Sequence, residues 1–463
     1  MYLKNRVEKD SLGEKPVPAG AYWGIHTQRA LENFTLSGRR VSLPLIKAIV
    51  LVKKAACQAN RELGFLTESK AQAIITACDE VLAGKLADQF PLDALQGGAG
   101  TSTNMNVNEV IANRAGELSG GQLGDYSLIH PLADVNLHQS TNDVYPTALK
   151  IAAIFGLKEL SQATAQLQGE FQKKEKEFAE IVKIGRTEMQ EAVPLTLGAE
   201  FSAFAEATAR DRWRTFKCEE RIRIVNIGGT AVGTGLAAPR KYIFLMIDKL
   251  RELTGLGISR AENSVDQTAN SDSLVEVSGI LKAQAANLIK ISSDLRLLNL
   301  LGEIKLPKEQ VGSSIMPGKV NPVILEAAIQ AGWQVIGADS QITAAASGSS
   351  LQINEFLPLL ADSLLVAIDL LTRTCLMLAR HVPGIKADPV KCRAYLEQSP
   401  TLITAFLPVL GYDQANLLLA EWQKVQPRNF REFLVEKLGR ELVDKTLSPY
   451  NLTALGYQDD KNS

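Results

Sequence analysis

The sequence predicts an all-α protein built around a central bundle of five long helices. The 463 residues are 46% hydrophobic and 22% charged, which suits a soluble protein with a large core and two or three domains. Apolar residues recur at steps of three and four over long proline-free stretches, and few segments show the alternation that is typical of strands. Together these patterns indicate long helices that bury one face each.

The clearest helical pattern begins at Leu274. Apolar residues follow it at helical spacing, namely Val277, Leu281, Ala285, Leu288, Ile291, Leu295 and Leu298. The pattern predicts one helix of about 25 residues, which would be about 37 Å long. Similar patterns predict further long helices over about 142–178, 196–225, 322–346 and 358–380. Five such helices predict an elongated bundle.

Shorter elements are expected on both sides of this bundle. The proline-rich segment KPVPAGAY indicates an irregular N-terminal stretch, which is followed by predicted helices at about 43–64 and 69–85. A break at His381-Val382-Pro383-Gly384 marks the approach to a small C-terminal helical domain. We therefore expect three domains, over about 1–139, 140–390 and 391–463.

Charge and hydropathy exclude several classes of partner. The formal net charge of −1 offers no basic excess for nucleic acid or an anionic membrane. No apolar run approaches the roughly 20 residues of a membrane-spanning helix. The first residues, MYLKNRVEKD, contain no hydrophobic signal-peptide core, so a cytoplasmic location is expected.

Neither a metal site nor a cofactor is expected. The five cysteines are far apart and form no C-x-x-C pair, so they are predicted to be reduced, mostly buried thiols. The four histidines show no metal-ligand spacing. The segment from Gly233 to Ala238 fits G-x-G-x-x-A, but Pro239 follows it and no strand precedes it, so a dinucleotide loop is not expected.

The segment GSSIMPGKVNP, residues 312–322, carries the strongest chemical signal. It places Ser313, Lys319 and Asn321 six and two residues apart beside flexible glycines. Abstraction of a proton next to a carboxylate creates an enolate-like dianion, which preplaced donors and a cation stabilise. A serine can act as the base only if its own oxyanion is held in the same way. The segment therefore favours carbanion chemistry on a carboxylic acid.

This segment resembles the signature loop of the fumarase/aspartase superfamily of lyases. Three further polar clusters, at 98–104, 139–143 and 185–190, match motifs of the same superfamily in the same chain order. Taken singly, each cluster is an ordinary helix N-cap, and we expect all three where helices begin. Helix N-termini also bind anions, which suits a small dicarboxylate.

The resemblance runs from RVEKDSLGEKPVPAGAY to about Gly411. It implies the superfamily's three-domain all-α fold, whose long helices form a homotetramer with a twenty-helix core. In this superfamily, each active site receives residues from three subunits. The implied partner is therefore a second copy of the chain together with a small dicarboxylate or amino-acid substrate.

The resemblance also implies a role for individual residues. Ser313 matches the general base, and Ser314 matches the neighbour that joins the substrate when the loop closes. Lys319 and Asn321 match the pair that binds the carboxylate beside the forming carbanion. Positions that match other substrate contacts are Thr101, Ser140, Thr141, Asn142 and Thr187.

Glu188 helps to distinguish ammonia from water as the leaving group. Fumarases of this type carry histidine at this position, where it works with a glutamate that Glu326 matches here, and aspartases carry glutamine or histidine. A carboxylate in a dicarboxylate site repels the substrate unless the substrate also bears an ammonium group, and two neighbouring carboxylates can share a proton. We therefore expect an aspartate ammonia-lyase-like elimination of ammonia from L-aspartate, or a close derivative, to give fumarate.

Two alternatives remain at this point. One is a fumarate hydratase. The other is a catalytically retired family member with an assembly or regulatory role, although an intact Ser313, Lys319 and Asn321 argue against it. Aspartases and fumarases carry a Ser-Gly-Pro-Arg segment where this chain reads LLNLLGEI, residues 297–304, and is about five residues shorter. We expect Asn299 and Gly302 to end the helix there and the substrate preference to change.

Overall fold

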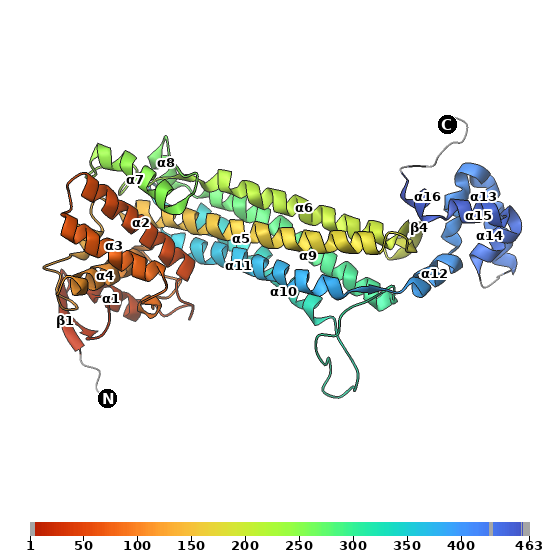
Figure 1. Ribbon diagram of the computed structural model, residues 1–463, viewed down its shortest axis with the longest axis horizontal. Coiled ribbons are helices and arrows are strands. Elements are labelled where there is room, and N and C mark those ends of the chain that lie inside the picture. The colour runs from red at the N-terminus through yellow and green to blue at the C-terminus, as the bar shows by residue number, and fades with distance from the viewer. Residues whose placement is uncertain (1–4, 426–428, 455, 457–463) are drawn as a thin grey trace. The chain divides into compact units, whose positions relative to one another are not determined.

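Figure 1 shows a computed structural model of the chain, which describes residues 5–425, 429–454 and 456. The described residues are mostly helical, and their strands form four two-stranded sheets. Two compact units are present. Unit 1 holds the chain up to Ser161 with Arg214–Ala283 and Gln334–Leu371, and unit 2 holds Gln162–Trp213, Gln284–Trp333 and the chain from Thr372. Every boundary between these segments falls within a long helix.

The five long helices occur where the sequence predicts them. They are α5 (Thr141–Glu177), α6 (Leu197–Ile222), α9 (Asp272–Leu301), α10 (Val323–Ser347) and α11 (Leu357–His381). The all-α fold class is confirmed. Helix α9 has 30 residues and is longer than predicted, since it begins two residues before Leu274 and continues three residues past Leu298.

Polar and aromatic contacts join these helices inside each unit. In unit 2, Gln284 of α9 donates to Thr164 Oγ1 of α5 at 2.9 Å and contacts Cys375 Sγ of α11 at 3.5 Å. In unit 1, the Asp339 carboxylate of α10 accepts from Ser278 Oγ and Lys282 Nζ of α9 at 2.7 and 2.6 Å. These buried polar groups of the long helices are therefore paired with groups on neighbouring helices.

The N-terminal part of unit 1 differs from the prediction. It begins with an antiparallel hairpin of β1 (Asn5–Asp10) and β2 (Gly13–Pro18), where an irregular stretch was expected. A local turn makes the hairpin possible, because Asp10 Oδ1 accepts the Leu12 N–H at 2.9 Å and Gly13 has a φ of 113°. Helices α1 (Ile25–Asn33), α2 (Leu43–Glu62), α3 (Glu68–Leu82) and α4 (Thr101–Leu118) follow.

Short elements complete unit 1 and begin the C-terminal part of unit 2. Unit 1 also contains α7 (Arg240–Thr254), α8 (Ser264–Ala269) and the parallel pair β5 (Ile224–Val225) and β6 (Ser259–Arg260). In unit 2, β7 (Ile304–Lys305) pairs with β8 (Lys386–Ala387). Helix α11 ends at His381, and a 3₁₀ turn over Val382–Gly384 follows, so the predicted break is confirmed.

The C-terminal helices of unit 2 surround their own apolar core. They are α12 (Pro389–Gln398), α13 (Leu407–Val425), α14 (Phe430–Leu438), α15 (Arg440–Thr446) and α16 (Pro449–Thr453), with a 3₁₀ turn over Pro400–Phe406. The core consists mainly of aromatic and branched aliphatic side chains, among them Leu402, Phe406, Phe430 and Leu434. Ile184 from a strand in the middle of the chain also joins this core.

One described segment, Pro400–Val425, is long and apolar enough to cross a membrane by length and composition alone. Polar residues interrupt this segment, so it contains no continuous apolar run of about 20 residues. Gly411 has φ 72° and ψ 169°, so the helical segment is kinked there. Its inward residues Leu402, Phe406 and Leu418 belong to the C-terminal core.

Helix α9 ends as predicted at Gly302. This glycine has a φ of 78°, and its N–H donates to Asn299 O at 3.1 Å while the Glu303 N–H donates to Leu298 O at 3.0 Å. The two hydrogen bonds form a Schellman motif, which satisfies carbonyls at the helix end. Asn299 Oδ1 also accepts the Leu306 N–H at 3.1 Å. The shortened segment is therefore a regular helix exit.

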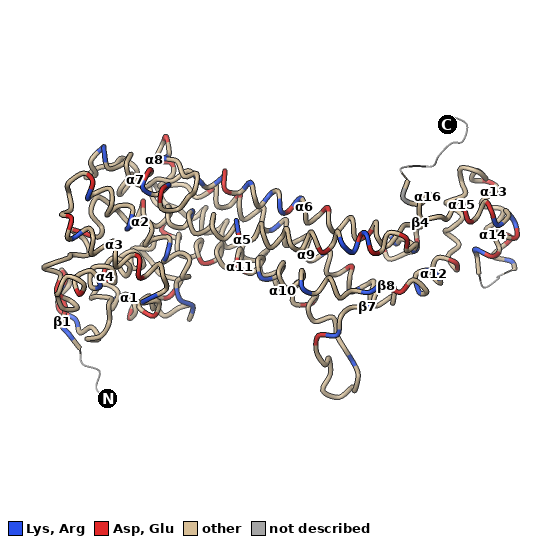
Figure 2. Tube along the Cα trace, viewed as in Figure 1, with Lys and Arg blue, Asp and Glu red and all other residues tan. Residues whose placement is uncertain are grey.

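Charges of both signs are spread along the chain, as Figure 2 shows, but one lysine lies fully inside unit 1. Lys53 of α2 is 0% exposed, and its Nζ donates to Asn136 Oδ1 at 2.8 Å and Gln139 Oε1 at 3.0 Å. Burial lowers the pKa of Lys53 from 10.5 to about 7, although the nearby Asp143 carboxylate acts in the opposite direction. The five cysteines are also buried and form no disulfide, as predicted.

Two glycines of α9 predict opposite effects on stability. Gly302→Ala should destabilise the protein by about 1 kcal/mol, because alanine disfavours the left-handed backbone that ends the helix. Gly279→Ala should instead stabilise it by up to about 1 kcal/mol, since Gly279 is helical and has open space at its Cβ position. Thermal unfolding of both variants would test this pair. A rise in melting temperature for Gly302→Ala would contradict the assigned helix exit.

The buried lysine predicts a pH-dependent stability. Unfolded Lys53 regains its ordinary pKa of 10.5, so between pH 7 and 10.5 the unfolded state binds more protons and stability rises with pH. The contribution of Lys53 to the free energy of unfolding increases by up to about 1.4 kcal/mol for each pH unit in this range. The melting temperature of wild type relative to Lys53→Met should therefore increase across this range. Lys54→Met, which alters a lysine paired with Asp79, is the control and should show no such trend.

Candidate active site

The predicted site residues fall into two groups, one in each unit. Unit 1 contains Thr101, Ser140, Thr141 and Asn142, and unit 2 contains Thr187, Glu188, Ser313, Ser314, Lys319, Asn321 and Glu326. Each group is a distinct local structure with its own hydrogen bonds. The first group lies at two helix N-termini, and the second lies in a hairpin turn, a long loop and the first turn of α10.

Thr101 is the first residue of α4. Gly98, Ala99 and Gly100 precede it with φ values of 81°, 56° and 88°, so three left-handed residues lead the chain into the helix. A Cβ at Gly100 would lie 2.3 Å from the ring of Tyr145 in α5. Only glycine therefore allows the start of α4 to approach α5 this closely.

Thr141 begins α5, and Ser140 caps it. The Asn142 N–H donates to Ser140 Oγ at 3.2 Å, and Asn104 Nδ2 of α4 donates to Thr141 Oγ1 at 3.1 Å. The prediction that these two clusters occur where helices begin is confirmed. The hydrogen bond between Asn104 and Thr141 joins the two helix N-termini, where unpaired N–H groups favour an anion.

Asp143 is a residue that the sequence reasoning missed. Its carboxylate is buried and accepts N–H groups from Ser140 at 3.0 Å, Gly228 at 3.0 Å and Thr230 at 2.9 Å. Burial raises the pKa of Asp143 to about 6, although these N–H groups lower it in part. The carboxylate therefore ties the start of α5 to the 228–230 turn. A charged residue directly after the Ser-Thr-Asn run was the available signal.

Asn142 contacts the same turn. Its Nδ2 donates to Ala231 O at 2.7 Å, and its carbonyl accepts from Asn226 Nδ2 at 2.9 Å. That carbonyl would normally bond to the N–H four residues later, but Pro146 occupies this position and has no N–H. The proline within α5 therefore frees an acceptor that holds the neighbouring loop.

The third cluster is a hairpin turn, so the prediction that a helix begins at 185–190 is wrong. Strands β3 (Val182–Thr187) and β4 (Gln190–Thr196) pair antiparallel, with Thr187 opposite Gln190. Glu188 and Met189 form the two-residue turn with φ values of 52° and 62°. Pairing with a second strand, rather than local capping, therefore decides this conformation.

The turn is unusual because neither residue favours a positive φ. Each such residue costs about 1–2 kcal/mol, and strain of this kind gathers at functional sites. Both side chains are exposed, and within the described residues the Glu188 carboxylate has no hydrogen-bond or ion-pair partner. Glu188 therefore presents a free carboxylate at a fixed turn.

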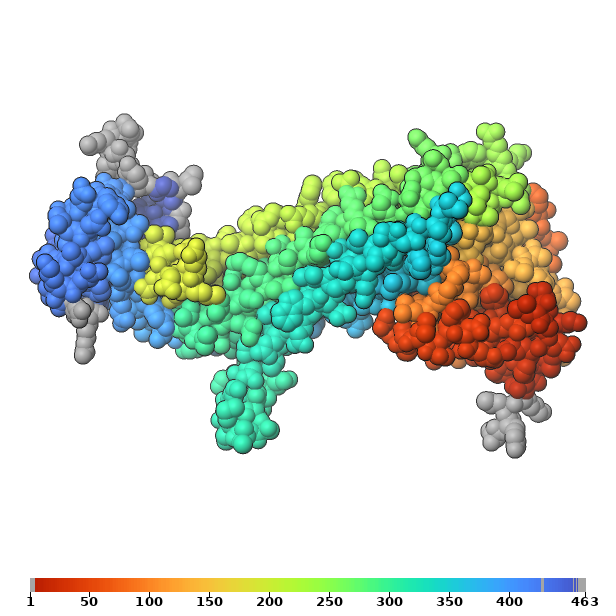
Figure 3. All heavy atoms as spheres, turned by 180° about the vertical axis from the view of Figure 1, so that it is seen from behind, coloured from red at the N-terminus to blue at the C-terminus, as the bar shows by residue number. Residues whose placement is uncertain are grey.

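The signature loop is closed at its base by two hydrogen bonds. The Gly312 N–H donates to Lys319 O at 2.8 Å, and Asn321 Nδ2 donates to Gly312 O at 2.9 Å. A Cβ at Gly312 would lie 2.7 Å from Asn321 N, so glycine is required there. Figures 1 and 3 show the segment between β7 and α10 projecting from the neighbouring helices.

The oxygen of Ser313 faces two backbone donors. Ser313 Oγ accepts the Met316 N–H at 2.9 Å and the Ile315 N–H at 3.2 Å. These N–H groups would stabilise an alkoxide more than a hydroxyl and so favour ionisation. Lys319 Nζ has no partner among the described residues and is exposed in the same loop. The loop therefore combines a serine prepared for ionisation with a free cation.

Glu326 lies in the first turn of α10. Its carboxylate is 3.8 Å from Arg296 Nη2 of α9, so a cation already balances it in part. The expectation that Glu326 and Glu188 share a proton stays a prediction. Ser314 is exposed in the signature loop, and Thr187 is the last residue of β3.

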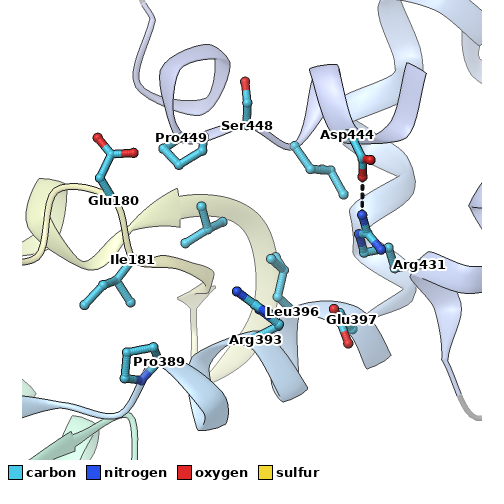
Figure 4. Close-up of a pocket in the computed structure, with 12 residues that line it drawn as sticks. Glu180, Ile181, Pro389, Arg393, Leu396, Glu397, Arg431, Asp444, Ser448 and Pro449 are labelled. Carbon is cyan, nitrogen blue, oxygen red and sulfur yellow. Dashed lines mark hydrogen bonds and ion pairs between the residues drawn. The ribbon is translucent and has the colours of Figure 1, made fainter. Parts of the chain in front are cut away.

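Neither a metal-ligand cluster nor a cavity in the described chain adds a residue to the candidate site. Within residues 5–425, 429–454 and 456, no three His, Cys, Asp or Glu side chains gather as metal ligands would. A cavity of about 510 Å³ lies among the C-terminal helices of unit 2 and β3, with Arg393 and the Arg431–Asp444 ion pair in its wall (Figure 4). It contains none of the predicted site residues.

Comparison with known proteins agrees with the motifs. A family model described as lyase matches residues 13–337. An aspartate ammonia-lyase from a Bacillus species is 44% identical over 97% of this chain and 98% of that protein. A fumarate lyase:delta crystallin from Brucella melitensis has a TM-score of 0.93 and 44% identity, covering 98% of this chain and 100% of that one. A class II fumarase from Schistosoma mansoni has a TM-score of 0.91 and 33% identity, with coverage of 96% and 98%. The chain belongs to the fumarase/aspartase superfamily of lyases.

Proposed function

We propose that this lyase is an aspartate ammonia-lyase, which converts L-aspartate into fumarate and ammonia. The observation that carries the proposal is the signature loop, in which two N–H groups face Ser313 Oγ and Lys319 Nζ is free in the described chain. The 44% identity to an aspartate ammonia-lyase over nearly the full length of both proteins supports the choice of substrate.

The proposed reaction is a β-elimination. Ser313 Oγ takes the proton from Cβ of L-aspartate, and the electron pair moves into the adjacent carboxylate to give an aci-carboxylate dianion. Lys319 and Asn321 stabilise this dianion by charge and by hydrogen bonding. The electron pair then forms the carbon–carbon double bond while the Cα–N bond breaks, and ammonia leaves. Ser313 returns its proton to solvent.

The remaining candidates bind the two ends of the substrate. The paired N-termini of α4 and α5 supply Thr101, Ser140, Thr141 and Asn142 as donors for a carboxylate. Thr187 and Ser314 supply hydroxyl groups from the hairpin and the signature loop. We further propose that these elements meet between subunits of a homotetramer, because they occur as separate local structures within one chain.

Glu188 supports ammonia rather than water as the leaving group. Its carboxylate would attract the α-ammonium group of aspartate, which malate lacks, and so offset its repulsion of the substrate carboxylates. Glu326 differs in that Arg296 balances part of its charge. The two carboxylates can therefore have different roles, with Glu188 selecting the amine and Glu326 assisting proton transfer.

The direct test compares substrates. Purified protein is incubated with L-aspartate and, separately, with L-malate, while the ultraviolet absorbance of fumarate is followed. Fumarate from aspartate at a kcat/KM above about 10⁴ M⁻¹s⁻¹ is the expected result. Preference for malate would indicate a hydratase. Preference for an N-substituted aspartate would support a related elimination, and no turnover at all would contradict the proposal.

Ser313→Ala should remove the base and leave the fold intact. Turnover should fall by on the order of 10²-fold or more, while the melting temperature stays near that of wild type, since Ser313 Oγ bonds only within its own loop. Ser347→Ala, at the end of α10, is a control in which activity should not change. If Ser313→Ala retains wild-type turnover, another group is the base.

Changes at Glu188 should alter the choice of leaving group. Glu188→Gln should keep deamination, because an amide can still accept from the ammonium group. Glu188→His should raise malate dehydration relative to aspartate turnover by about tenfold. The ratio of kcat/KM values for the two substrates is the measurement. An unchanged ratio in both variants would show that Glu188 does not select the leaving group.

Shared active sites predict complementation between inactive variants. When Ser313→Ala and Thr187→Ala subunits are mixed and exchanged, about a quarter of the sites should receive neither change, and activity should return in proportion. Each variant alone serves as the control. Absence of recovery after exchange has been verified, or full activity in a monomer, would contradict sites built from several subunits.

A further inference from the structure

A buried carboxylate lies behind the hairpin that carries Thr187 and Glu188. Glu303 is 0% exposed, and its carboxylate contacts Arg186 Nη1 at 2.8 Å and Lys183 Nζ at 2.9 Å. Lys183 also contacts Glu200 at 2.8 Å, so two cations and two anions compensate each other. All four residues belong to unit 2.

Hydrogen bonds of its own N–H and carbonyl hold the backbone of Glu303 in place, independently of the contacts that its side chain makes with the hairpin. Its N–H closes the end of α9, as the hydrogen bond to Leu298 O shows, and its carbonyl accepts the Asp388 N–H at 2.9 Å. The next residue, Ile304, pairs with Ala387 in the β7–β8 ladder. The segment that lacks Ser-Gly-Pro-Arg therefore delivers one carboxylate from a rigid helix exit.

The tip of the hairpin needs such an anchor. The strand register shifts between Ile184 and Arg186, where Ala192 and Val193 of β4 lie opposite the single residue Gly185. Gly185 approaches Val193 so closely that a Cβ would lie 2.7 Å from the Val193 carbonyl oxygen. Beyond this bulge, only the pairs of Arg186 with Glu191 and of Thr187 with Gln190 continue the ladder. A bulge loosens pairing locally, so contacts outside the hairpin must hold its tip.

Arg186 makes those contacts with two different groups. Besides Glu303, its guanidinium lies over the ring of Tyr395 at 5.1 Å, and the Tyr395 hydroxyl donates to Leu301 O at 3.2 Å. On the opposite strand, Glu191 Oε2 accepts from Ser399 Oγ at 2.6 Å. The helix exit and α12 together therefore hold both strands next to the strained turn.

We propose that Glu303 is a positioning residue that, through Arg186, holds Thr187 and the Glu188 turn where the substrate binds. Buried ion pairs often add little net stability. The Glu303–Arg186 pair is therefore important for its position, because Arg186 directly precedes Thr187 and the Glu188 turn. The inference rests on the proposed function for its kinetic consequence. Its structural consequence, an ordered hairpin tip, is independent of the substrate.

The test uses Glu303→Gln in the full-length protein. KM for aspartate should rise by about tenfold, as expected when a substrate hydrogen bond from Thr187 is weakened, while kcat changes by less than about threefold. Hydrogen–deuterium exchange should become faster over residues 186–191. Asp339→Asn is the control, because it weakens the contact of the buried Asp339 carboxylate with the half-exposed Lys282 between α9 and α10 and should lower stability without changing KM.

If Glu303→Gln does not fold, Arg186→Gln serves as the second variant. It should fold, because Arg186 is partly exposed and the Glu303 carboxylate keeps Lys183 as its partner. It should raise KM equally, and the double variant should be no worse than either single one. Unchanged KM with unchanged exchange at 186–191, or the same changes in Asp339→Asn, would overturn the proposal. If wild type does not turn over aspartate, the proposed function fails, whereas faster exchange specific to the two hairpin variants still supports the positioning role.

Discussion

Buried carboxylates that bind chain segments to helix ends determine the geometry of this protein around its candidate site. Asp143 accepts three backbone N–H groups and so fixes the start of α5 against the 228–230 turn. Glu303 leaves the end of α9 and holds the β3–β4 hairpin through Arg186 and Lys183. A buried charge is unfavourable unless it is paired and hydrogen-bonded. Because each partner is necessary, the segments that supply these partners have little freedom to move.

Hydrogen-bonding groups at helix ends and turns also suit the proposed chemistry. A helix N-terminus leaves backbone N–H groups without partners, and these can serve an anionic substrate without additional lysines. In the signature loop, the N–H groups of Ile315 and Met316 face Ser313 Oγ instead. A serine in water is a poor base, but these donors preferentially stabilise its ionised form. In the proposed reaction, the backbone geometry of the loop would thus activate Ser313.

In the proposed function, substrate choice depends on the charges of Glu188 and Glu326. The strained turn at Glu188 and Met189 presents a carboxylate with no partner in the described chain. Glu326 lies near Arg296, so the two carboxylates have different electrostatic surroundings. A free carboxylate favours a substrate that carries an ammonium group. The position of Glu188 therefore connects a local backbone feature to the proposed preference for aspartate.

The sequence by itself determined the all-α class, the five long helices, the exit of α9 at Gly302 and the motifs of the superfamily. These features depend on local periodicity, capping and glycine conformations, which are written in neighbouring residues. The β1–β2 hairpin and the turn at Glu188 were not predictable in this way, because pairing with a second strand decides them. Only the tertiary structure revealed Asp143, Lys53 and Glu303 as buried, since their partners lie far away in the chain and burial is a property of the assembled core.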